Sequence, residues 1–166
     1  MNRYFAILVL LPILAGAPSA AQDFKAGVDA FRKGDYATAV REWKPLAELG
    51  SVPAQFNLGL IFERGLGQPP DLVEATRWYA LAAENGATAA QINLGYAYES
   101  GRGVERDFVQ AHKWYQVAAE RLPEGERRDK AVRNRDALAT KMTTAEVDEA
   151  LRLSRDWLKK WRQRRR

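Results

Sequence analysis

The feature that most constrains this chain is an internal repeat of 36 residues. The segments "AQFNLGLIFERGLGQPPDLVEATRWYALAAENG" (54–86) and "AQINLGYAYESGRGVERDFVQAHKWYQVAAERL" (90–122) align without a gap and share their small, aromatic and acidic positions. An earlier copy keeps mainly the second half of the pattern and has a loop four residues shorter. Units of this length bury a continuous core only by stacking on their neighbours. The repeat therefore predicts an array of stacked supersecondary units.

Each copy predicts two helices joined by a glycine-rich loop. Ala54 and Leu58 belong to an apolar run at helical spacing, and Gly65 ends that run. Asp71 then stands where a second helix needs an N-cap, and Gly86 stands just past the end of that helix. The expected units are residues 22–50 (degenerate), 51–86 and 87–122.

Small residues at repeated positions indicate close packing between helices. Gly59 and Gly95 lie in the middle of predicted helices, where glycine costs about 1 kcal/mol relative to alanine. We therefore expect a second helix to approach them closely, through Ala75 and Ala111, while the aromatic pairs fill the space between successive helix pairs. The residues of this predicted packing pattern are Leu58, Gly59, Gly65, Gly67, Ala75, Trp78, Tyr79, Leu94, Gly95, Gly101, Gly103, Ala111, Trp114 and Tyr115.

The segment after the array predicts two further helices, residues 123–161, and a basic tail, residues 162–166. Thr143 and Glu146 have the spacing of a capping box. The last fifteen residues hold eight Lys and Arg against one acid, whereas the net charge of the whole chain is +5. The basic side chains at the end are Lys159, Lys160, Arg162, Arg164, Arg165 and Arg166. Three interpretations remain open: a solvated helix end, attachment to anionic lipid or an acidic partner, and nucleic-acid binding.

The first residues have the pattern of a secretory signal peptide. Arg3 precedes an apolar run over 4–14, and small residues up to Ala21 suit cleavage there, so residues 1–21 are the predicted signal. The alternative is an uncleaved anchor, but the run is shorter than the roughly 20 residues a membrane span needs, and Pro12 interrupts it. We therefore expect an exported protein, periplasmic or secreted, of bacterial type.

The composition argues against catalytic and metal chemistry. The chain has no cysteine and one histidine, which removes thiol nucleophiles and multi-histidine metal sites. The single histidine, His112, is expected to be a partly exposed helix residue. The glycine-rich loops lack the preceding strand and the lysine–serine or lysine–threonine pair of a phosphate loop. We expect no enzyme activity, no metal and no cofactor.

The two complete copies resemble Sel-one-like repeats, a branch of the tetratricopeptide-like helical superfamily. The shared motif is A-Q-x-x-L-G-x-x-[YF]-x-x-G-x-G-x-x-x-D-x-x-x-A-x-x-W-Y-x-x-A-A, and the resemblance covers about residues 24 to 122. It implies an all-α fold, a right-handed α-α solenoid of about three helix-pair repeats with a C-terminal capping helix pair. It also implies a non-enzymatic scaffold that binds other proteins.

In related solenoids the first helices line the concave face, which implies a partner-binding surface here. The candidate residues are Phe56, Leu60, Glu63, Ile92, Tyr96 and Glu99. Exposed aromatic side chains on a curved face suit an extended peptide or a partner helix. The alternative is that terminal helices fold back and cover this face. The two glutamates are either acidic points of the groove or partners of neighbouring arginines such as Arg64 and Arg102.

The predicted function is a non-catalytic scaffold for protein–protein interaction in the bacterial cell envelope. The partner is expected to be a protein or a peptide, and its identity is unknown. The alternative is a peripheral envelope protein that the basic C-terminus attaches to an anionic membrane or polymer. Nucleic acid is not an expected partner, because the predicted destination is outside the cell.

Overall fold

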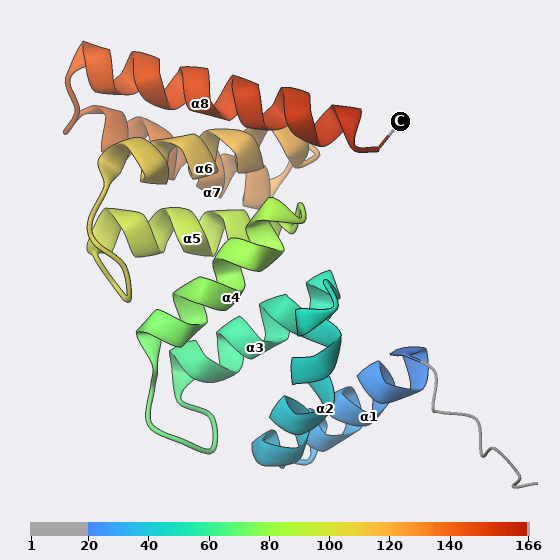
Figure 1. Cartoon of the computed structure of the whole chain (residues 1–166). Helices are drawn as coiled ribbons and strands as arrows, with labels where there is room; N and C mark the ends of the chain where they lie inside the picture. Colours follow the sequence, from blue (N-terminus) through green and yellow to red (C-terminus); the bar gives the residue numbers. More distant parts are fainter. Residues whose placement is uncertain (1–19, 166) are drawn as a thin grey trace, which may run out of the picture.

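The computed structural model describes residues 20–165, and its side chains from residue 24 onward. Within that part the chain forms helices and no strand, which confirms the predicted all-α fold (Figure 1). The helices are α1 (Ala20–Arg32), α2 (Tyr36–Glu48), α3 (Val52–Arg64), α4 (Leu72–Glu84), α5 (Thr88–Ser100), α6 (Phe108–Arg121), α7 (Glu126–Ala139) and α8 (Thr144–Gln163). The predicted signal peptide lies outside the described residues, except for its last two, which begin α1.

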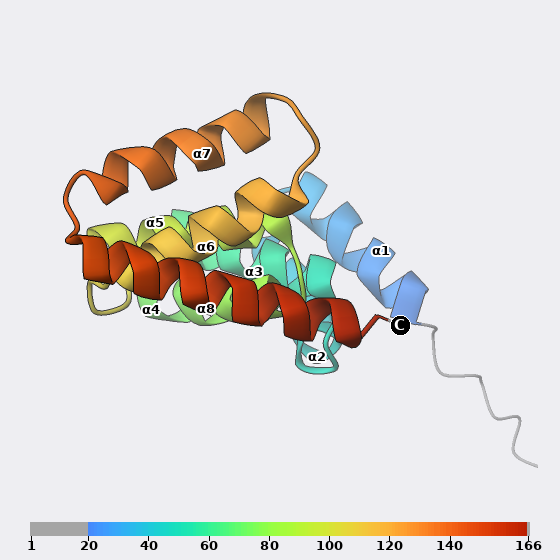
Figure 2. The ribbon, with the colours of Figure 1, turned by 90° about the horizontal axis from the view of Figure 1, so that it is seen from above.

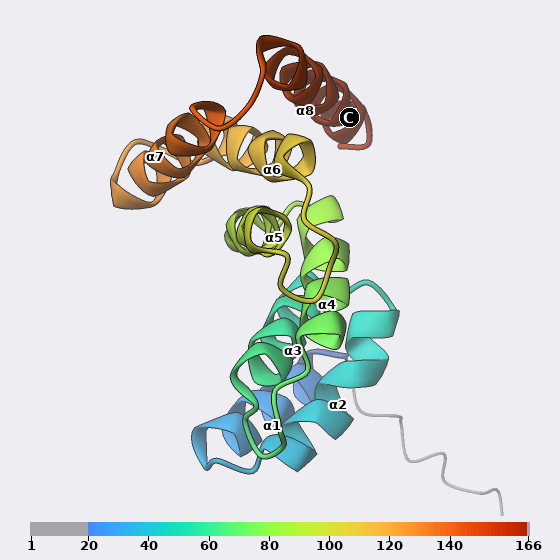
Figure 3. The same ribbon diagram turned by 90° about the vertical axis from the view of Figure 1, so that its left-hand side faces the viewer.

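Successive helices pair and stack, as the solenoid prediction requires. α1 packs on α2, α3 on α4 and α5 on α6, and each pair also packs on the next through α2 with α3 and α4 with α5. Figure 3 shows α1 and α7 projecting toward the same side, beyond α3 and α5, while α8 lies on the opposite side. The first helices of the repeats therefore line the inner side of the curve.

Helix ends follow the sequence signals closely. Asp35, Asp71 and Asp107 begin the second helices, and each carboxylate accepts a hydrogen bond at 2.9–3.0 Å from the backbone N–H three residues later. Gly65 and Gly101 end α3 and α5 in the left-handed region, with φ of +63° and +71°. A side chain at such a φ is strained, so the repeated glycines fix where each helix stops.

The mid-helix glycines make room for a tyrosine ring, and not for the alanines we expected. A Cβ added to Gly59 would lie 2.5 Å from Cε1 of Tyr79, and one added to Gly95 would lie 2.7 Å from Cε1 of Tyr115. Gly27 in the first repeat faces a tryptophan ring in the same way. Close approach was predicted correctly, but the facing group was wrong. Spacing identifies a small residue without saying which neighbouring side chain occupies the space.

The two members of each aromatic pair pack in different directions. Trp78 lies among buried side chains of α2 and α3, so it joins its repeat to the previous one. Tyr79 lies in the next cluster, which includes Leu94 of α5. Trp114 belongs to that same cluster, and Tyr115 packs against α7. The expectation that these pairs fill the space between successive helix pairs is confirmed.

A buried glutamine at the start of each first helix links the repeats, a role that sequence reasoning missed. Nε2 of Gln55 donates to the backbone oxygen of Ala47 at 2.9 Å, and Nε2 of Gln91 donates to that of Ala83 at 3.1 Å. Both acceptors lie in the last turn of the preceding helix, where backbone carbonyls lack intrahelical partners. The letters A-Q recur at the same position in both copies, so the sequence already indicated that the two glutamines have a common role.

The two C-terminal helices do not pack on each other as a pair. α7 and α8 each pack on α6, and Figure 2 shows them on opposite sides of it. The capping box is present: Thr143 Oγ1 accepts from the N–H of Glu146 at 3.3 Å, and the Glu146 carboxylate accepts from the N–H of Thr143 at 2.7 Å. α8 covers the outer side of α6, and α7 borders the inner side.

Candidate functional site

The inner side of the curve carries a groove formed between successive repeats. Phe56 of α3 and Ile92 of α5 line it, and Arg127 and Lys130 of α7 stand at its edge. Its volume is about 360 Å³, and the remaining lining residues are Thr88, Ala89, Asn93 and Leu122. Two of the six predicted partner-binding residues therefore meet in one groove. α7 borders this groove without filling it.

The floor of the groove is held in place by core contacts below it. The ring of Phe56 lies 5.9 Å from the ring of Tyr79, centroid to centroid, and the side chain packs against the cluster around Leu94. Ile92 packs against buried side chains of α6 and α7. Both residues are half-buried, so each supports the fold with one edge and offers the other to the groove.

The other two apolar candidates lie apart from this groove. Leu60 is half-buried and packs against the core cluster shared by α4 and α5. Tyr96 is 46% exposed, which makes it the most exposed tyrosine of the described residues. The guanidinium of Arg102 lies 5.8 Å from the centroid of the Tyr96 ring. Tyr96 thus offers an aromatic surface nearer the glycine loops, one helical turn along α5 from Ile92.

Glu63 and Glu99 have a repeated intramolecular partner. The hydroxyl of Tyr79 donates to Glu63 at 2.7 Å, and the hydroxyl of Tyr115 donates to Glu99 at 2.9 Å. Glu99 also pairs with Lys141 at 3.4 Å, and not with the arginine we named. These carboxylates satisfy the buried tyrosine hydroxyls, which need an acceptor. Each remains half-exposed at the rim of the inner face.

The repeated tyrosines are electrostatically unusual because of this arrangement. Burial raises the pKa of Tyr79 and of Tyr115 well above the ordinary value near 10, and the neighbouring carboxylates raise it further. Both phenols therefore stay neutral donors across the range of pH in which proteins usually work. Their position is structural, since each hydroxyl is already used by a glutamate of its own repeat.

His112 is buried, so the expectation of a partly exposed residue was wrong. Only 3% of it is exposed, its Nδ1 has no hydrogen-bond partner within the described part, and burial lowers its pKa. The equivalent Thr76 is also buried, and its hydroxyl donates to the backbone oxygen of Arg102 at 3.1 Å. Over residues 20–165, no group of three or more His, Cys, Asp or Glu side chains is placed to hold a metal.

The tryptophans near the C-terminus face inward. Trp157 is 7% exposed, and its Nε1 donates to Glu84 at 2.6 Å. Trp161 stacks on Trp157 and on the guanidinium of Arg121, which lies 3.9 Å from the ring centroid. Trp157 is therefore not available to enter a membrane interface, and the half-buried Trp161 is held against the fold by these two contacts. No helix of the described part is long and apolar enough to span a bilayer.

The basic residues of the C-terminal end divide into two groups by position. Lys160 and Arg164 line a second groove, between α8 and the α4–α6 side. Lys159, Arg162 and Arg165 are exposed, and Arg162 lies 4.0 Å from Glu120. The sixth predicted residue, Arg166, lies outside the described residues. α8 is helical through Gln163, so Lys159, Lys160 and Arg162 lie on the helix, whereas Arg164 and Arg165 follow its end.

Comparison with known proteins identifies the repeat. The Sel1 repeat family model matches residues 52–86 and 88–121. A Sel1 repeat protein of known structure from Oxalobacter formigenes is 30% identical, and the match covers 71% of this chain and 88% of that one with a TM-score of 0.62. The chain belongs to the Sel1 repeat family. Sel1 repeat proteins usually act as scaffolds for protein–protein interaction.

A second structure extends the likeness beyond the two Sel1 repeats. It is that of c5321, described as a protective antigen present in uropathogenic Escherichia coli strains and displaying an SLR fold. It is 33% identical to this chain, with a TM-score of 0.75 over 86% of this chain. The chain spans only 30% of the length of c5321, so the activities of that larger protein do not transfer. No curated protein matches the chain.

Proposed function

We propose that this Sel1 repeat protein is an interaction scaffold of the bacterial cell envelope that binds a peptide segment of its partner in the inner-face groove. The observation that carries the proposal is the meeting of Phe56 and Ile92, from successive Sel1 repeats, in one open groove. Such a surface exists only because two repeats stack, and it lies on the side where a solenoid offers its extended concave face. The envelope location rests on the signal pattern of residues 1–21.

The chemistry of the groove favours an apolar anchor next to an acidic residue. Phe56, Ile92 and Leu122 supply apolar surface, whereas Arg127 and Lys130 place two positive charges at one edge. Polar groups at the rim of an apolar pocket fix the orientation of a ligand more than they add affinity. The basic C-terminal end is the competing attachment point, but its tryptophans are used inside the fold.

Site-specific photo-crosslinking tests this proposal. A photoreactive phenylalanine analogue at Ala89, an exposed residue of the groove, is expected to capture a defined partner in the envelope fraction. Phe56→Ser in the same chain should abolish the captured band while the protein stays folded, because Phe56 is only partly buried and lines the groove. The matched control is the analogue at Val73, which is 68% exposed on α4 and does not line the groove.

Equal capture from positions 89 and 73, or capture unaffected by Phe56→Ser, would contradict the groove. Thermal melting of Phe56→Ser separates a lost contact from a lost fold. A folded protein that no longer captures the partner supports the site, whereas a large fall in Tm shows that Phe56 is a core residue. Recovery of the protein only from the cytoplasm would contradict the envelope location.

A further inference from the structure

The second groove, on the opposite side of α6, has an excess of positive charge that the fold itself does not neutralise. It has a volume of about 780 Å³ and lies between α6, α8 and the end of α4. Four cations line it, Lys113, Arg152, Lys160 and Arg164, against the carboxylates of Glu84 and Asp156. The inner-face groove shares none of these residues, so the two sites are independent.

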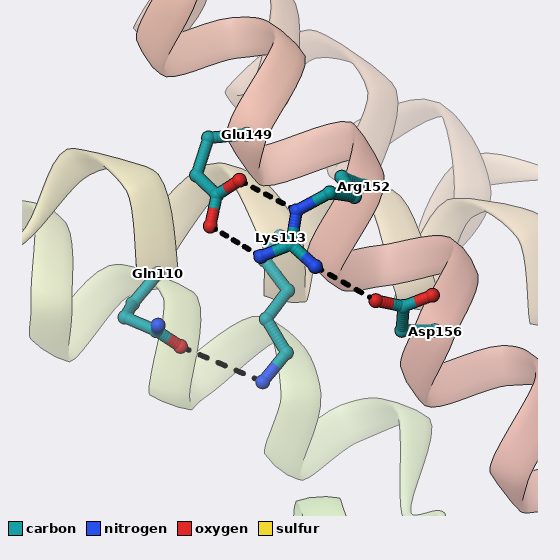
Figure 4. Close-up of polar contacts among 5 residues, drawn as sticks. All are labelled: Gln110, Lys113, Glu149, Arg152 and Asp156. Carbon is teal, nitrogen blue, oxygen red and sulfur yellow. Dashed lines mark hydrogen bonds and ion pairs between the residues drawn. The ribbon is translucent and has the colours of Figure 1, made fainter.

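The paired and unpaired charges are separated along the groove, as Figure 4 shows. Arg152 is satisfied within α8, because its guanidinium donates to Glu149 at 2.6 and 2.7 Å and to Asp156 at 3.0 Å. Lys113 of α6 ends away from both of those carboxylates (Figure 4), and its Nζ has a single hydrogen bond, at 3.5 Å to Gln110. At one end of the groove the positive charge of Arg152 is therefore neutralised, whereas at the other end Lys113 has no carboxylate partner.

The ammonium of Lys113 lies in an unfavourable setting for a charge. It is half-buried and stands 4.2 Å from the ring centroid of Trp114, which offers a π face but no hydrogen-bond acceptor. Burial is the main cause that lowers the pKa of Lys113; Glu84 opposes this effect, and the charge of Lys160 lowers the pKa further. Lys113 and Lys160 thus face the same space, and within the described part neither has a carboxylate within ion-pair distance.

Glu84, the remaining acid, is already engaged elsewhere. Its carboxylate accepts the indole N–H of Trp157 at 2.6 Å, and its backbone oxygen lies 3.5 Å from the guanidinium of Arg164. Trp157 and Leu153 line the groove beside these groups and give it an apolar strip. Charge and shape together fit an elongated anion with some apolar surface.

We propose that the groove between α6 and α8 binds an extended acidic peptide whose carboxylates alternate with neutral residues. The lining residues of α8 run from Arg152 to Arg164, which is about 18 Å of helix, or five to six residues of an extended chain. Lys160 and Arg164 are one turn apart, about 6 Å. Alternate residues of an extended peptide lie about 6.6 Å apart on one side of the chain. Carboxylates at positions i and i+2 of the peptide therefore match the spacing of Lys160 and Arg164.

A flat anionic membrane is a poorer fit to the same residues. Lys113 and Lys160 line a recess between two helices, whereas a flat surface would meet exposed cations equally well outside the recess, such as Lys159. The distinction gives a matched pair on adjacent positions of one helix. Lys160→Gln and Lys159→Gln remove the same charge, but only the first changes the lining of the groove.

Fluorescence anisotropy with purified full-length protein tests the proposal. The probe is a fluorescein-labelled peptide Glu-Ala-Glu-Ala-Glu, and its control is Gln-Ala-Gln-Ala-Gln. We expect the acidic peptide alone to bind, with a Kd that rises as salt increases. Lys160→Gln and Lys113→Gln should each weaken binding by about threefold to tenfold, and Lys159→Gln by less than about twofold.

Several results would overturn the proposal. One is equal loss in Lys159→Gln and Lys160→Gln, which would mean that overall charge is responsible. Another is binding of the glutamine peptide as tightly as the glutamate peptide. A third is co-sedimentation with phosphatidylglycerol vesicles, lost in Lys159→Gln, without peptide binding, which would assign the cations to a membrane. Since Lys160 is exposed, its variant should fold normally and keeps the test valid if Lys113→Gln is unstable.

Discussion

At the scale of residues, three letters of the repeat act as one unit. Gly95 leaves space for the ring of Tyr115, and the hydroxyl of that ring donates to Glu99 at 2.9 Å. Gly59, Tyr79 and Glu63 repeat the arrangement 36 residues earlier. The recurrence of all three letters was visible in the sequence, but their mutual contact was not. Glycine on one helix and tyrosine on the other meet only after the two helices have packed.

This unit predicts that Gly95→Ala destabilises the fold. A Cβ at 2.7 Å from the Tyr115 ring forces a shift that destabilises the fold by about 1–3 kcal/mol. The better helix propensity of alanine offsets about 1 kcal/mol of this destabilisation. Urea denaturation followed by circular dichroism measures the change. In Tyr115→Leu the clash is absent, so Gly95→Ala should cost less there or become favourable. Strictly additive costs in the double variant would contradict the steric account.

At the scale of elements, α8 shows that the sequence predicts a helix and its buried face, but not the neighbour which that face contacts. The apolar stripe and the capping box of Thr143 and Glu146 predicted the helix and its buried face, and both are present. The surface that this stripe would cover was not predictable, because burial of apolar area is favourable against any apolar neighbour. In the structure, α8 crosses α6 and reaches Glu84 at the end of α4 through Trp157.

Trp157 is therefore expected to be the main anchor of α8. Trp157→Ala should lower the free energy of unfolding by about 3–5 kcal/mol, since it empties a buried site and removes the partner of Glu84. Trp161→Ala is the matched control and should cost clearly less, because Trp161 is half-buried. Denaturant unfolding gives the two values, and hydrogen exchange should show faster exchange in α8 for Trp157→Ala. A larger effect of Trp161→Ala would argue for a different anchor.

At the scale of the whole molecule, the repeat produces two unlike sides. The inner side has an apolar groove with two cations at its edge, and the side covered by α8 has a cationic groove. α6 separates them, because α7 and α8 pack on it from opposite sides (Figure 2). A solenoid of three helix pairs can thus present two independent surfaces to a partner.

The stability of the whole fold is expected to fall at alkaline pH. The pKa of both Tyr79 and Tyr115 is raised in the folded state, whereas an unfolded tyrosine ionises near pH 10. Above that pH the unfolded state has lost protons that the native state still holds, so stability decreases as pH rises. The slope is about 1.4 kcal/mol per pH unit for each tyrosine, and the stability is fully present below pH 10.

Urea unfolding between pH 9 and 11.5 measures this slope. The variant Tyr79→Phe with Tyr115→Phe should be less stable at pH 8, because Glu63 and Glu99 lose their donors, but its stability should fall less steeply above pH 10. Identical slopes in the wild type and the double variant would show that other groups control alkaline unfolding.

The sequence by itself determined the period, the helix pairs, their caps and the residues that form the core, because these depend on spacing and on local hydrogen bonding. Asp71 caps a helix wherever that helix lies, and Gly65 ends one by its own backbone conformation. Only the tertiary structure decided what those helices face. In the structure, Gly59 faces a tyrosine ring and His112 is buried. α7 and α8 pack on opposite sides of α6, and Lys160 lines a groove that Lys159 does not line. Each of these depends on contacts between residues far apart in the chain, which hydrophobic burial favours without specifying the partner.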